Sequence, residues 1–339
     1  MKKQLKDVCE GFTKNIAQKD LSENNGKYPI FGASGIIKTI DFYISDKPYI
    51  GIVKDGSGVG RTNKYPAKSS LLGTMQYILP NQGIDLDYLM YGIRSLHLGE
   101  NYSGAAIPHI YFKVYKNRTL DFPELAEQKQ RSIVLNKIQD AINVKEKQLF
   151  ELENIIQSEF VEMFGENPVE SGKWKVAKWA DKVRITNGRD YKKLVVKTGL
   201  YPVYGSGGDM GIRVDDYLCS ENTVIIGRKG NIDKPIFVKE KFWNVDTAFG
   251  LNVDESEINP YYFFEHSKKY NYRSMDTGVT IPSLTKTALF ELKLAIPPLD
   301  LQNQFAAFVQ QIDKSKFVVK RQIADLQELL DSKMQEYFG

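Results

Sequence analysis

The sequence predicts an α+β protein made of two mainly-β domains, each followed by a long helix, with the two helices pairing as an antiparallel coiled coil with pseudo-two-fold symmetry. Three observations lead to this prediction. The second half of the chain repeats the first, the first part of each repeat has a strand-like composition, and the second part has apolar residues at helical spacing. The predicted segments are residues 1–122 and 167–296 for the β domains and residues 123–166 and 297–339 for the helices.

The repeat consists of short segments that keep their order and spacing. Residues 28–35 return as residues 201–208, and the apolar run with its glycine turn at residues 50–56 returns as residues 224–230. Further matches join Ile107-Pro108 to Ile281-Pro282, Pro123-Glu124-Leu125 to Pro297-Pro298-Leu299, and residues 158–165 to residues 332–339. Because a fixed period is the signature of a duplicated architecture, two domains of one fold are expected.

The first part of each repeat is rich in glycine, tyrosine, phenylalanine and short β-branched runs. Residues 49–53 and 223–226 are two such runs, and glycine, Asn-Gly and aspartate residues punctuate the sequence around them. This pattern is typical of short strands joined by turns. We therefore expect compact, mainly-β domains that contain a few helices.

The second part of each repeat contains no proline after its opening turn and no glycine before its end. Its apolar residues recur every three, four or seven positions: Ile138, Ile142, Leu149, Leu152, Ile156, Phe160 and Met163 in the first copy, and Phe305, Phe308, Ile312, Val319, Ile323, Leu326, Leu330 and Met334 in the second. A helix of about 40 residues is roughly 60 Å long, which is more than one small domain can cover. Pairing of the two helices is the favoured interpretation, and packing of each helix on its own β domain is the alternative.

Composition and charge limit the classes of function. The chain has 339 residues, a formal net charge of +4 and 42% apolar residues, so it is mildly basic and has globular proportions. We find no apolar stretch of membrane-spanning length and no signal peptide, and we expect a cytoplasmic protein with no membrane partner. Cys9 and Cys219 have no Cys or His neighbour at metal-ligand spacing, so we expect reduced, structural thiols and no metal site.

Several short motifs together resemble those of a known family. They are the Tyr-Pro-x-(Phe/Tyr)-Gly-x-x-Gly segment, the Ile-Pro turn, the Pro-x-Leu-x-x-Gln sequence at each helix start (Pro123, Leu125, Gln128; Pro297, Leu299, Gln302) and the closing Phe-Gly. In this order, and over essentially the whole chain, they resemble the specificity subunit of Type I restriction-modification systems. The resemblance implies that residues 1–122 and 167–296 are target-recognition domains. Each would read one half of a bipartite, asymmetric DNA site.

The resemblance also implies partners and one departure. The helices would set the gap between the half-sites and dock modification subunits, two per chain, which methylate adenine with S-adenosylmethionine. Restriction subunits would join the complex, ATP and Mg²⁺ would belong to the partner subunits, and no cofactor is expected in this chain. Trp174 precedes the predicted first strand of the second copy and has no counterpart in the first copy. We therefore expect the edge of the first domain to be incomplete or closed differently.

The candidate DNA-binding residues are basic residues near the two glycine turns. They are Lys54, Arg61, Lys64 and Lys68 in the first copy and Arg213, Arg228, Lys229 and Lys234 in the second, with Tyr65 and Phe237 among them. Lys and Arg neutralise phosphates, and Arg also reads guanine in the major groove. The alternative is that each of these charges is an ordinary solvated loop charge.

Two motifs resemble functional loops but favour other interpretations. Residues 56–60, Gly-Ser-Gly-Val-Gly, are not followed by Gly-Lys-Ser/Thr, so a turn that lets the backbone approach DNA phosphate is preferred to a nucleotide-binding loop. Residues 259–262, Asn-Pro-Tyr-Tyr, are similar to the base-holding loop of adenine methyltransferases but lack its second proline. We interpret Asn259 as a helix cap followed by proline in the first turn, and Asp85 as its counterpart.

No catalytic set of His, Cys or carboxylate groups recurs in both copies, so the chain is not expected to be an enzyme. Two alternatives remain. One is a methyltransferase or nuclease with an unfamiliar site that uses Asn259 or Asp233. The other is a scaffolding protein whose coiled coil joins protein partners. Unaided methylation or cleavage of DNA would favour the first, and binding that ignores DNA sequence and salt would favour the second.

Overall fold

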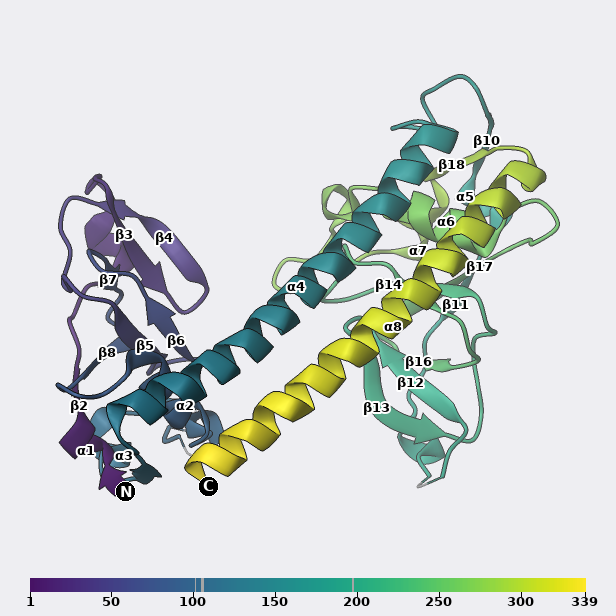
Figure 1. Cartoon of the computed structure of the whole chain (residues 1–339). Coiled ribbons are helices and arrows are strands. Elements are labelled where there is room, and N and C mark those ends of the chain that lie inside the picture. Colours follow the sequence, from purple (N-terminus) through teal and green to yellow (C-terminus); the bar gives the residue numbers. More distant parts are fainter. Residues whose placement is uncertain (101, 105–106, 197) are drawn as a thin grey trace. The chain divides into compact units, whose positions relative to one another are not determined.

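The computed structural model describes residues 1–100, 102–104, 107–196 and 198–339, which form two compact units. Unit 1 contains Met1–Lys147 and Lys320–Gly339, and unit 2 contains Gln148–Val319. Each unit combines one mainly-β domain with the first part of one long helix and the last part of the other (Figure 1). The elements follow the same order in both units.

Unit 1 consists of short strands and short helices before the first long helix. The strands are β1 (Lys2–Gln4), β2 (Cys9–Phe12), β3 (Tyr28–Gly32), β4 (Gly35–Ile40), β5 (Tyr49–Val53), β6 (Thr62–Tyr65), β7 (Ser70–Leu71), β8 (Met75–Pro80) and β9 (Thr119–Asp121). The helices are α1 (Leu5–Val8), η1 (Gln18–Leu21), α2 (Leu86–Arg94), η2 (Leu98–Glu100), α3 (Phe112–Tyr115) and α4 (Leu125–Phe164), which continues into unit 2.

Unit 2 repeats this series. Its strands are β10 (Lys175–Lys178), β11 (Val183–Asn187), β12 (Tyr201–Gly205), β13 (Gly208–Val214), β14 (Thr223–Gly227), β15 (Ile236–Val238), β16 (Trp243–Asn244), β17 (Ala248–Val253) and β18 (Lys293–Ile296). Its helices are α5 (Trp179–Lys182), η3 (Lys192–Leu194), α6 (Pro260–Ser267), η4 (Tyr272–Met275), α7 (Lys286–Phe290) and α8 (Leu299–Phe338), which continues into unit 1.

The strand order is also the same in the two units. The antiparallel sheet β2-β8-β5-β6 corresponds to β11-β17-β14-β15. The sheet β4-β3-β7 corresponds to β13-β12-β16, and in both the middle strand has one antiparallel and one parallel neighbour. The first strand of each unit pairs with the strand that precedes the long helix, β1 with β9 and β10 with β18. The predicted duplication is confirmed.

Strands β5 and β14 are the apolar runs seen in the sequence, and they position the loops that follow them. Every residue of both strands is buried. A short continuous apolar run fits a strand that is covered on both faces. The glycine turn after each strand therefore starts from a rigid point of its domain.

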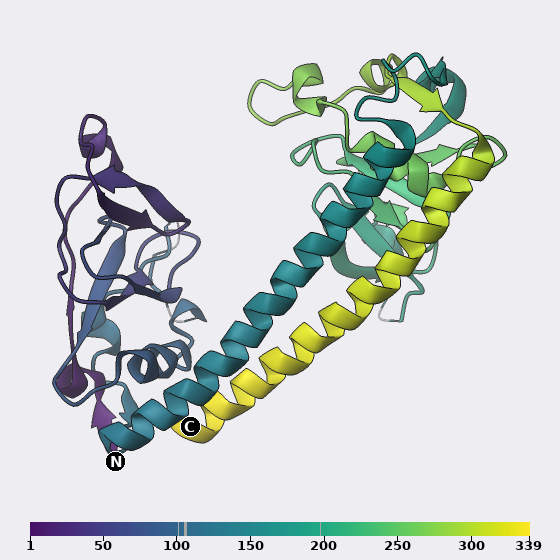
Figure 2. The same cartoon turned by 45° about the horizontal axis from the view of Figure 1, so that its top comes forward.

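Helices α4 and α8 pack antiparallel to each other within each unit, as Figures 1 and 2 show. Their apolar stripes share one core in each unit: Leu135, Ile138, Ile142, Leu330 and Met334 in unit 1, and Ile156, Phe160, Phe305 and Val309 in unit 2. The start of one helix meets the end of the other, so the predicted antiparallel pairing is confirmed. The same two clusters include residues of the β domains, so the helix ends also complete the domain cores.

A buried glutamine explains the Pro-x-Leu-x-x-Gln motif at each helix start. In unit 2 the Gln302 amide accepts from the Asn259 backbone N–H at 2.9 Å and donates to the carbonyls of Glu257 and Pro297 at 3.1 and 2.8 Å. The equivalent partners of Gln128 in unit 1 are Asp85, Gly83 and Pro123. Each glutamine therefore ties the start of a long helix to the loop before α2 or α6.

Asn259 and Asp85 are helix caps, as interpreted from the sequence. The Asn259 side chain accepts from the Tyr261 N–H at 2.9 Å, with Pro260 in the first turn of α6. The Asp85 side chain accepts from the Tyr88 N–H at 2.9 Å at the start of α2. Capping satisfies backbone donors that have no partner inside the helix.

The edge of the first domain is complete, so of the two expected alternatives, an incomplete edge or a differently closed one, the second holds. β1 pairs with β9 in the same antiparallel manner as β10 with β18. The two edges are nevertheless closed by different groups, as expected. In unit 2, Trp174 lies just before β10, and its indole N–H donates to the Phe164 carbonyl in the last turn of α4 at 2.9 Å.

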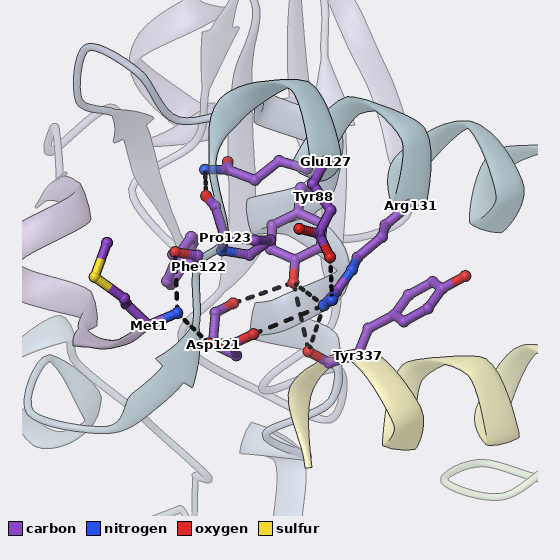
Figure 3. Close-up of polar contacts among 9 residues, drawn as sticks. Met1, Tyr88, Asp121, Phe122, Pro123, Glu127, Arg131 and Tyr337 are labelled. Atoms are coloured by element: carbon purple, nitrogen blue, oxygen red, sulfur yellow. Dashed lines mark hydrogen bonds and ion pairs between the residues drawn. The ribbon is translucent and has the colours of Figure 1, made fainter.

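Unit 1 caps the last turn of α8 with a cation and a phenol (Figure 3). The Arg131 guanidinium and the Tyr88 hydroxyl each donate to the Tyr337 carbonyl at 3.4 Å. Arg131 also lies 3.7 Å from the Asp121 carboxylate. A positive charge is favourable at a helix C-terminus, where carbonyls lack partners. The position of Arg131 is taken in unit 2 by Phe305, which packs against aromatic rings.

Candidate nucleic-acid interface

The glycine turn and the Ile-Pro turn lie against each other in each unit, although they are far apart in the chain. We call the two turns together the loop pair. It comprises residues 54–61 with 103–104 and 107–110 in unit 1, and residues 228–235 with 276–284 in unit 2. The sequence repeat marks both turns, but a contact between distant segments leaves no periodic pattern and was not predicted.

Backbone hydrogen bonds hold the loop pair of unit 2 together. They run from Gly230 N–H to the Pro282 carbonyl at 2.9 Å, from Leu284 N–H to the Arg228 carbonyl at 2.9 Å, and from Thr277 N–H to the Ser283 carbonyl at 3.0 Å. Ser283 also forms an isolated antiparallel bridge with Lys229. Three backbone segments therefore lie side by side, with Ser283 in the middle one.

Unit 1 has the same bonds at the equivalent positions of the repeat. They run from Gly56 N–H to the Pro108 carbonyl at 2.9 Å, from Ile110 N–H to the Lys54 carbonyl at 2.8 Å, and from Ser103 N–H to the His109 carbonyl at 2.9 Å. Since all of these bonds join backbone groups, the side chains of the loop pair are not needed to make them. The two units thus present different side chains on one backbone arrangement.

Gly56 and Gly230 are required by backbone conformation. Their φ angles are 95° and 84°, in the region that side chains disfavour. A Cβ atom added to Gly56 would meet nothing within 4 Å, so space is not the constraint there. Glycine is needed because this conformation aims the N–H at the Ile-Pro turn.

The four predicted cations of unit 1 are only partly brought together. Lys54 and Arg61 lie on the glycine turn, Lys64 lies on β6 and Lys68 lies beyond it. Three are engaged by local groups: Lys54 pairs with Asp55, Lys64 with Asp87 at 2.6 Å, and the Arg61 guanidinium donates to the Ala33 carbonyl at 3.0 Å. Most positive charge of the unit 1 loop pair is therefore already balanced or bonded locally.

The predicted cations of unit 2 are more accessible to a ligand. Arg228, Lys229 and Lys234 share one loop and are exposed, and the described residues give none of them an ion-pair partner. The Arg228 guanidinium lies 5.9 Å from the centre of the Phe249 ring and makes one long hydrogen bond, to the Asp246 carbonyl at 3.5 Å. Arg213 lies on β13, in the other sheet, and pairs with Asp209 at 3.2 Å. Three of the four residues thus form one cationic loop.

Sequence reasoning missed two features of the loop pair. Arg273 on η4 pairs with Asp233 of the glycine turn at 2.8 Å, and this hydrogen bond holds the pKa of the Asp233 carboxyl below its usual value. Ile281 and its counterpart Ile107 were noted only as markers of the repeat, yet both side chains are exposed. Their equal position in the two copies was the signal that could have identified them.

The described residues contain no group of three or more His, Cys, Asp or Glu side chains that could hold a metal ion. No helix in the same part of the chain is long and apolar enough to cross a membrane. Both cysteines are buried and unpaired, and burial raises the pKa of each thiol to about 12. Such thiols are poor nucleophiles at neutral pH.

The duplicated fold has relatives of known class. A protein of Mycoplasma pneumoniae named as a putative type I specificity subunit is 22% identical over an alignment of 330 residues, and the match covers 89% of this chain and 86% of that protein. The crystal structure of the Type-I restriction-modification S subunit from M. genitalium covers 100% of this chain and 96% of its own, with 17% identity and a TM-score of 0.59. One chain of a structure that concerns complex assembly and conformational transition of the type I R-M system is also similar. The match covers 99% of this chain and 97% of that one, with 12% identity and a TM-score of 0.50.

The family itself is shown by a match that spans most of the sequence. The pattern of the Type I restriction modification DNA specificity domain fits the chain twice, at residues 1–154 and at residues 171–328. The resemblance found in the short motifs is thereby confirmed. This chain belongs to the Type I restriction-modification DNA specificity family, whose members are non-catalytic subunits that specify DNA sequence, and it carries two copies of the specificity domain.

Proposed function

We propose that the chain recognises a bipartite, asymmetric DNA site, with each unit contacting one half through its loop pair. The observation that carries this proposal is the repetition of the loop pair. Its backbone hydrogen bonds are equivalent in the two units, while the side chains around them differ in charge and in local pairing. Two similar surfaces with different side chains suit two half-sites of one chemical type and unequal sequence.

The DNA contacts proposed for unit 2 are Arg228, Lys229 and Lys234, because they are exposed beside the loop pair. Lys54, Arg61, Lys64 and Lys68 have the same role in unit 1, and Arg213 contributes from β13. Phosphate contacts by such residues give affinity and orientation, whereas contacts to base edges give specificity. The exposed cations of unit 2 supply the larger share of the phosphate contacts.

The paired helices set the gap between the half-sites and dock two modification subunits. Each helix is continuous over 40 residues and contributes to both units, which supports a fixed spacer. Phe150 of α4 and Phe317 of α8 are 66% and 69% exposed in unit 2. Large exposed apolar side chains on a helix support docking of a protein partner.

The chemistry of the complex belongs to the partner subunits. The modification subunits methylate adenine with S-adenosylmethionine, and the restriction subunits cleave DNA with ATP and Mg²⁺. This chain specifies the DNA sequence at which they act.

Mapping of methylated adenine in genomic DNA tests the proposal. Cells that carry the chain with its modification subunit should show one gapped, asymmetric methylated motif. Replacing residues 1–122 by the corresponding domain of another family member should change one half of that motif and leave the other half intact. A change in both halves would contradict modular reading. The absence of any motif would favour the scaffolding alternative.

A shortened spacer tests the role of the helices. Removing seven residues from each helix, around Ile142 and Lys316, keeps the apolar register and shortens each helix by about 10 Å, the length of about three base pairs. The gap between the half-sites should become shorter by about that amount. An unchanged gap would refute spacing by the helices.

A further inference from the structure

An exposed isoleucine occupies the same place in both loop pairs. Ile281 is 57% exposed in unit 2, and Ile107, at the equivalent position of the repeat, is 64% exposed in unit 1. A single exposed aliphatic side chain needs no explanation. Here the same β-branched residue is exposed twice, at a point where the neighbouring charged residues differ between the units. The folds of the two domains do not require either side chain to be covered.

The turn that carries Ile281 is held firmly. The Asp276 carboxylate accepts from the backbone N–H groups of Gly278 and Ser283, both at 2.8 Å, and these bonds keep the pKa of Asp276 below its usual value. The Thr277 hydroxyl donates to the Ser283 carbonyl at 3.2 Å. A pre-organised turn loses little conformational entropy on binding. Ile281 is therefore presented to a partner in one defined place.

The surroundings of Ile281 are cationic. The loop pair of unit 2 carries three cations, Arg228, Lys229 and Lys234, and two acidic residues. Asp233 is balanced by Arg273, and the Asp276 carboxylate is engaged by two backbone N–H groups of its own turn. An uncharged protein or lipid surface that covered only the isoleucine would gain nothing from these charges. Charge complementarity favours a polyanion that also exposes apolar groups.

The width of the loop pair selects the groove. The bridge between Lys229 and Ser283 and the hydrogen bond from Thr277 to Ser283 align three backbone segments. At roughly 4.8 Å between neighbouring segments, the outer backbone segments lie about 10 Å apart without their side chains, so the loop pair is too wide for the minor groove. The major groove of B-DNA is about 12 Å wide, whereas the minor groove is about 6 Å wide. The apolar group that the major groove displays is the C5-methyl group of thymine.

We propose that Ile281 contacts a thymine methyl group in the major groove of one half-site, and that Ile107 does the same in the other half. The proposal rests on the DNA recognition proposed above and adds which base the two isoleucines favour. The isoleucine supplies the apolar contact, while the cations beside it hold the phosphates.

Uracil, which is thymine without the methyl group, provides the test. The complex with the modification subunit is titrated with duplexes of the mapped motif in which one thymine at a time is replaced by uracil. At one position in the half-site read by unit 2, replacing thymine by uracil should weaken binding by the unaltered chain about fourfold. This is the loss expected for one methyl-sized apolar contact. I281A should bind the thymine duplex weaker by a similar factor and should not distinguish it from the uracil duplex. I107A should show the same behaviour in the other half only.

Several results separate success from failure. Equal effects of I281A on the thymine and uracil duplexes would overturn the methyl contact, and so would a half-site without thymine. A loss of DNA bending that does not depend on the methyl group would assign the isoleucine to a wedge between base pairs instead. I281V, which keeps a branched side chain, should retain most of the discrimination. If the unaltered chain showed no sequence preference at all, the proposed function would fail rather than this inference.

Discussion

Replacement of Gln302 by methionine should destabilise unit 2 strongly. The side chain is fully buried, and methionine fills similar space without any of its hydrogen bonds. The change leaves the Asn259 N–H and the carbonyls of Glu257 and Pro297 without the partner that now lies within 3.1 Å of each. Each buried polar group that loses its partner costs about 1 to 3 kcal/mol. The bond to the Pro297 carbonyl is buried and the other two are part-buried, so we take the lower limit for each of the three groups, which predicts a loss of at most about 3 kcal/mol.

Urea unfolding followed by tryptophan fluorescence measures this loss in the correct part of the chain, because Trp174, Trp179 and Trp243 all lie in unit 2. At a typical slope of about 2 kcal/mol per molar urea, the midpoint should fall by at most about 1.5 M. The matched control is Q304M, because Gln304 is exposed two residues further along α8 and should change stability by less than about 0.5 kcal/mol. A loss in Q302M below about 1 kcal/mol, the cost of a single unpaired group, or an equal loss in Q304M, would refute the reasoning.

Three further predictions concern charge and burial. Changing Arg228 and Lys229 to alanine should reduce the salt dependence of non-specific DNA binding by about 0.9 in the log–log slope for each phosphate that is no longer neutralised. K178A should leave the slope unchanged, because Lys178 lies outside the proposed contacts and pairs with Glu291; equal effects would contradict the assignment. Burial lowers the pKa of His266 to about 4, and neither ring nitrogen bonds to another described residue. The unfolded state therefore binds the proton first as pH falls, and about 3 kcal/mol of stability should be lost between pH 6.5 and 4. H266F should remove this pH dependence of stability, and an unchanged pH dependence in H266F would contradict the assignment to His266. The two buried thiols should resist alkylation at neutral pH until urea unfolds the chain, and rapid labelling of the folded protein would show that they are accessible.

The parts of the fold that depend on periodicity could be predicted from the sequence. The apolar stripes of α4 and α8 specify long helices and the face that each buries, since a helical residue and those three or four positions away share one side. The buried runs in β5 and β14 specify central strands in the same way. The offset of the repeat then extends each assignment from one copy to the other.

The closing of the domain edges could not be predicted from the repeat. Trp174 in unit 2 and Arg131 in unit 1 both donate to the last turn of a long helix, but they come from different positions of the repeat. A carbonyl that needs a donor accepts either an indole or a guanidinium, so a missing tryptophan does not mean a missing cap. Only the three-dimensional arrangement shows which group supplies the cap.

The local pairing of the candidate cations was equally hidden. Lys54 and Arg228 are equivalent positions of the repeat, and both are basic. Both lie over an aromatic ring, Lys54 over Tyr111 and Arg228 over Phe249. Lys54 is also paired because Asp55 follows it, whereas Arg228 is followed by Lys229. Arg213 looked similar in sequence but lies in another sheet and pairs with Asp209. Counting basic residues near a turn therefore overstates the charge that can meet DNA.

The repeated loop pair separates what the chain needs for folding from what it needs for recognition. Its shape depends on backbone hydrogen bonds, on glycine at positions 56 and 230 and, in unit 2, on the side chains of Asp276 and Thr277, so the other exposed side chains can change without loss of the turn. Sequence patterns report the constrained positions, because those positions must repeat for the fold to repeat. The side chains that we propose as DNA contacts are free of this constraint and differ between the copies. The two isoleucines are the exception: they repeat although the fold leaves them exposed, and this combination is the reason to assign them to the DNA rather than to the protein core.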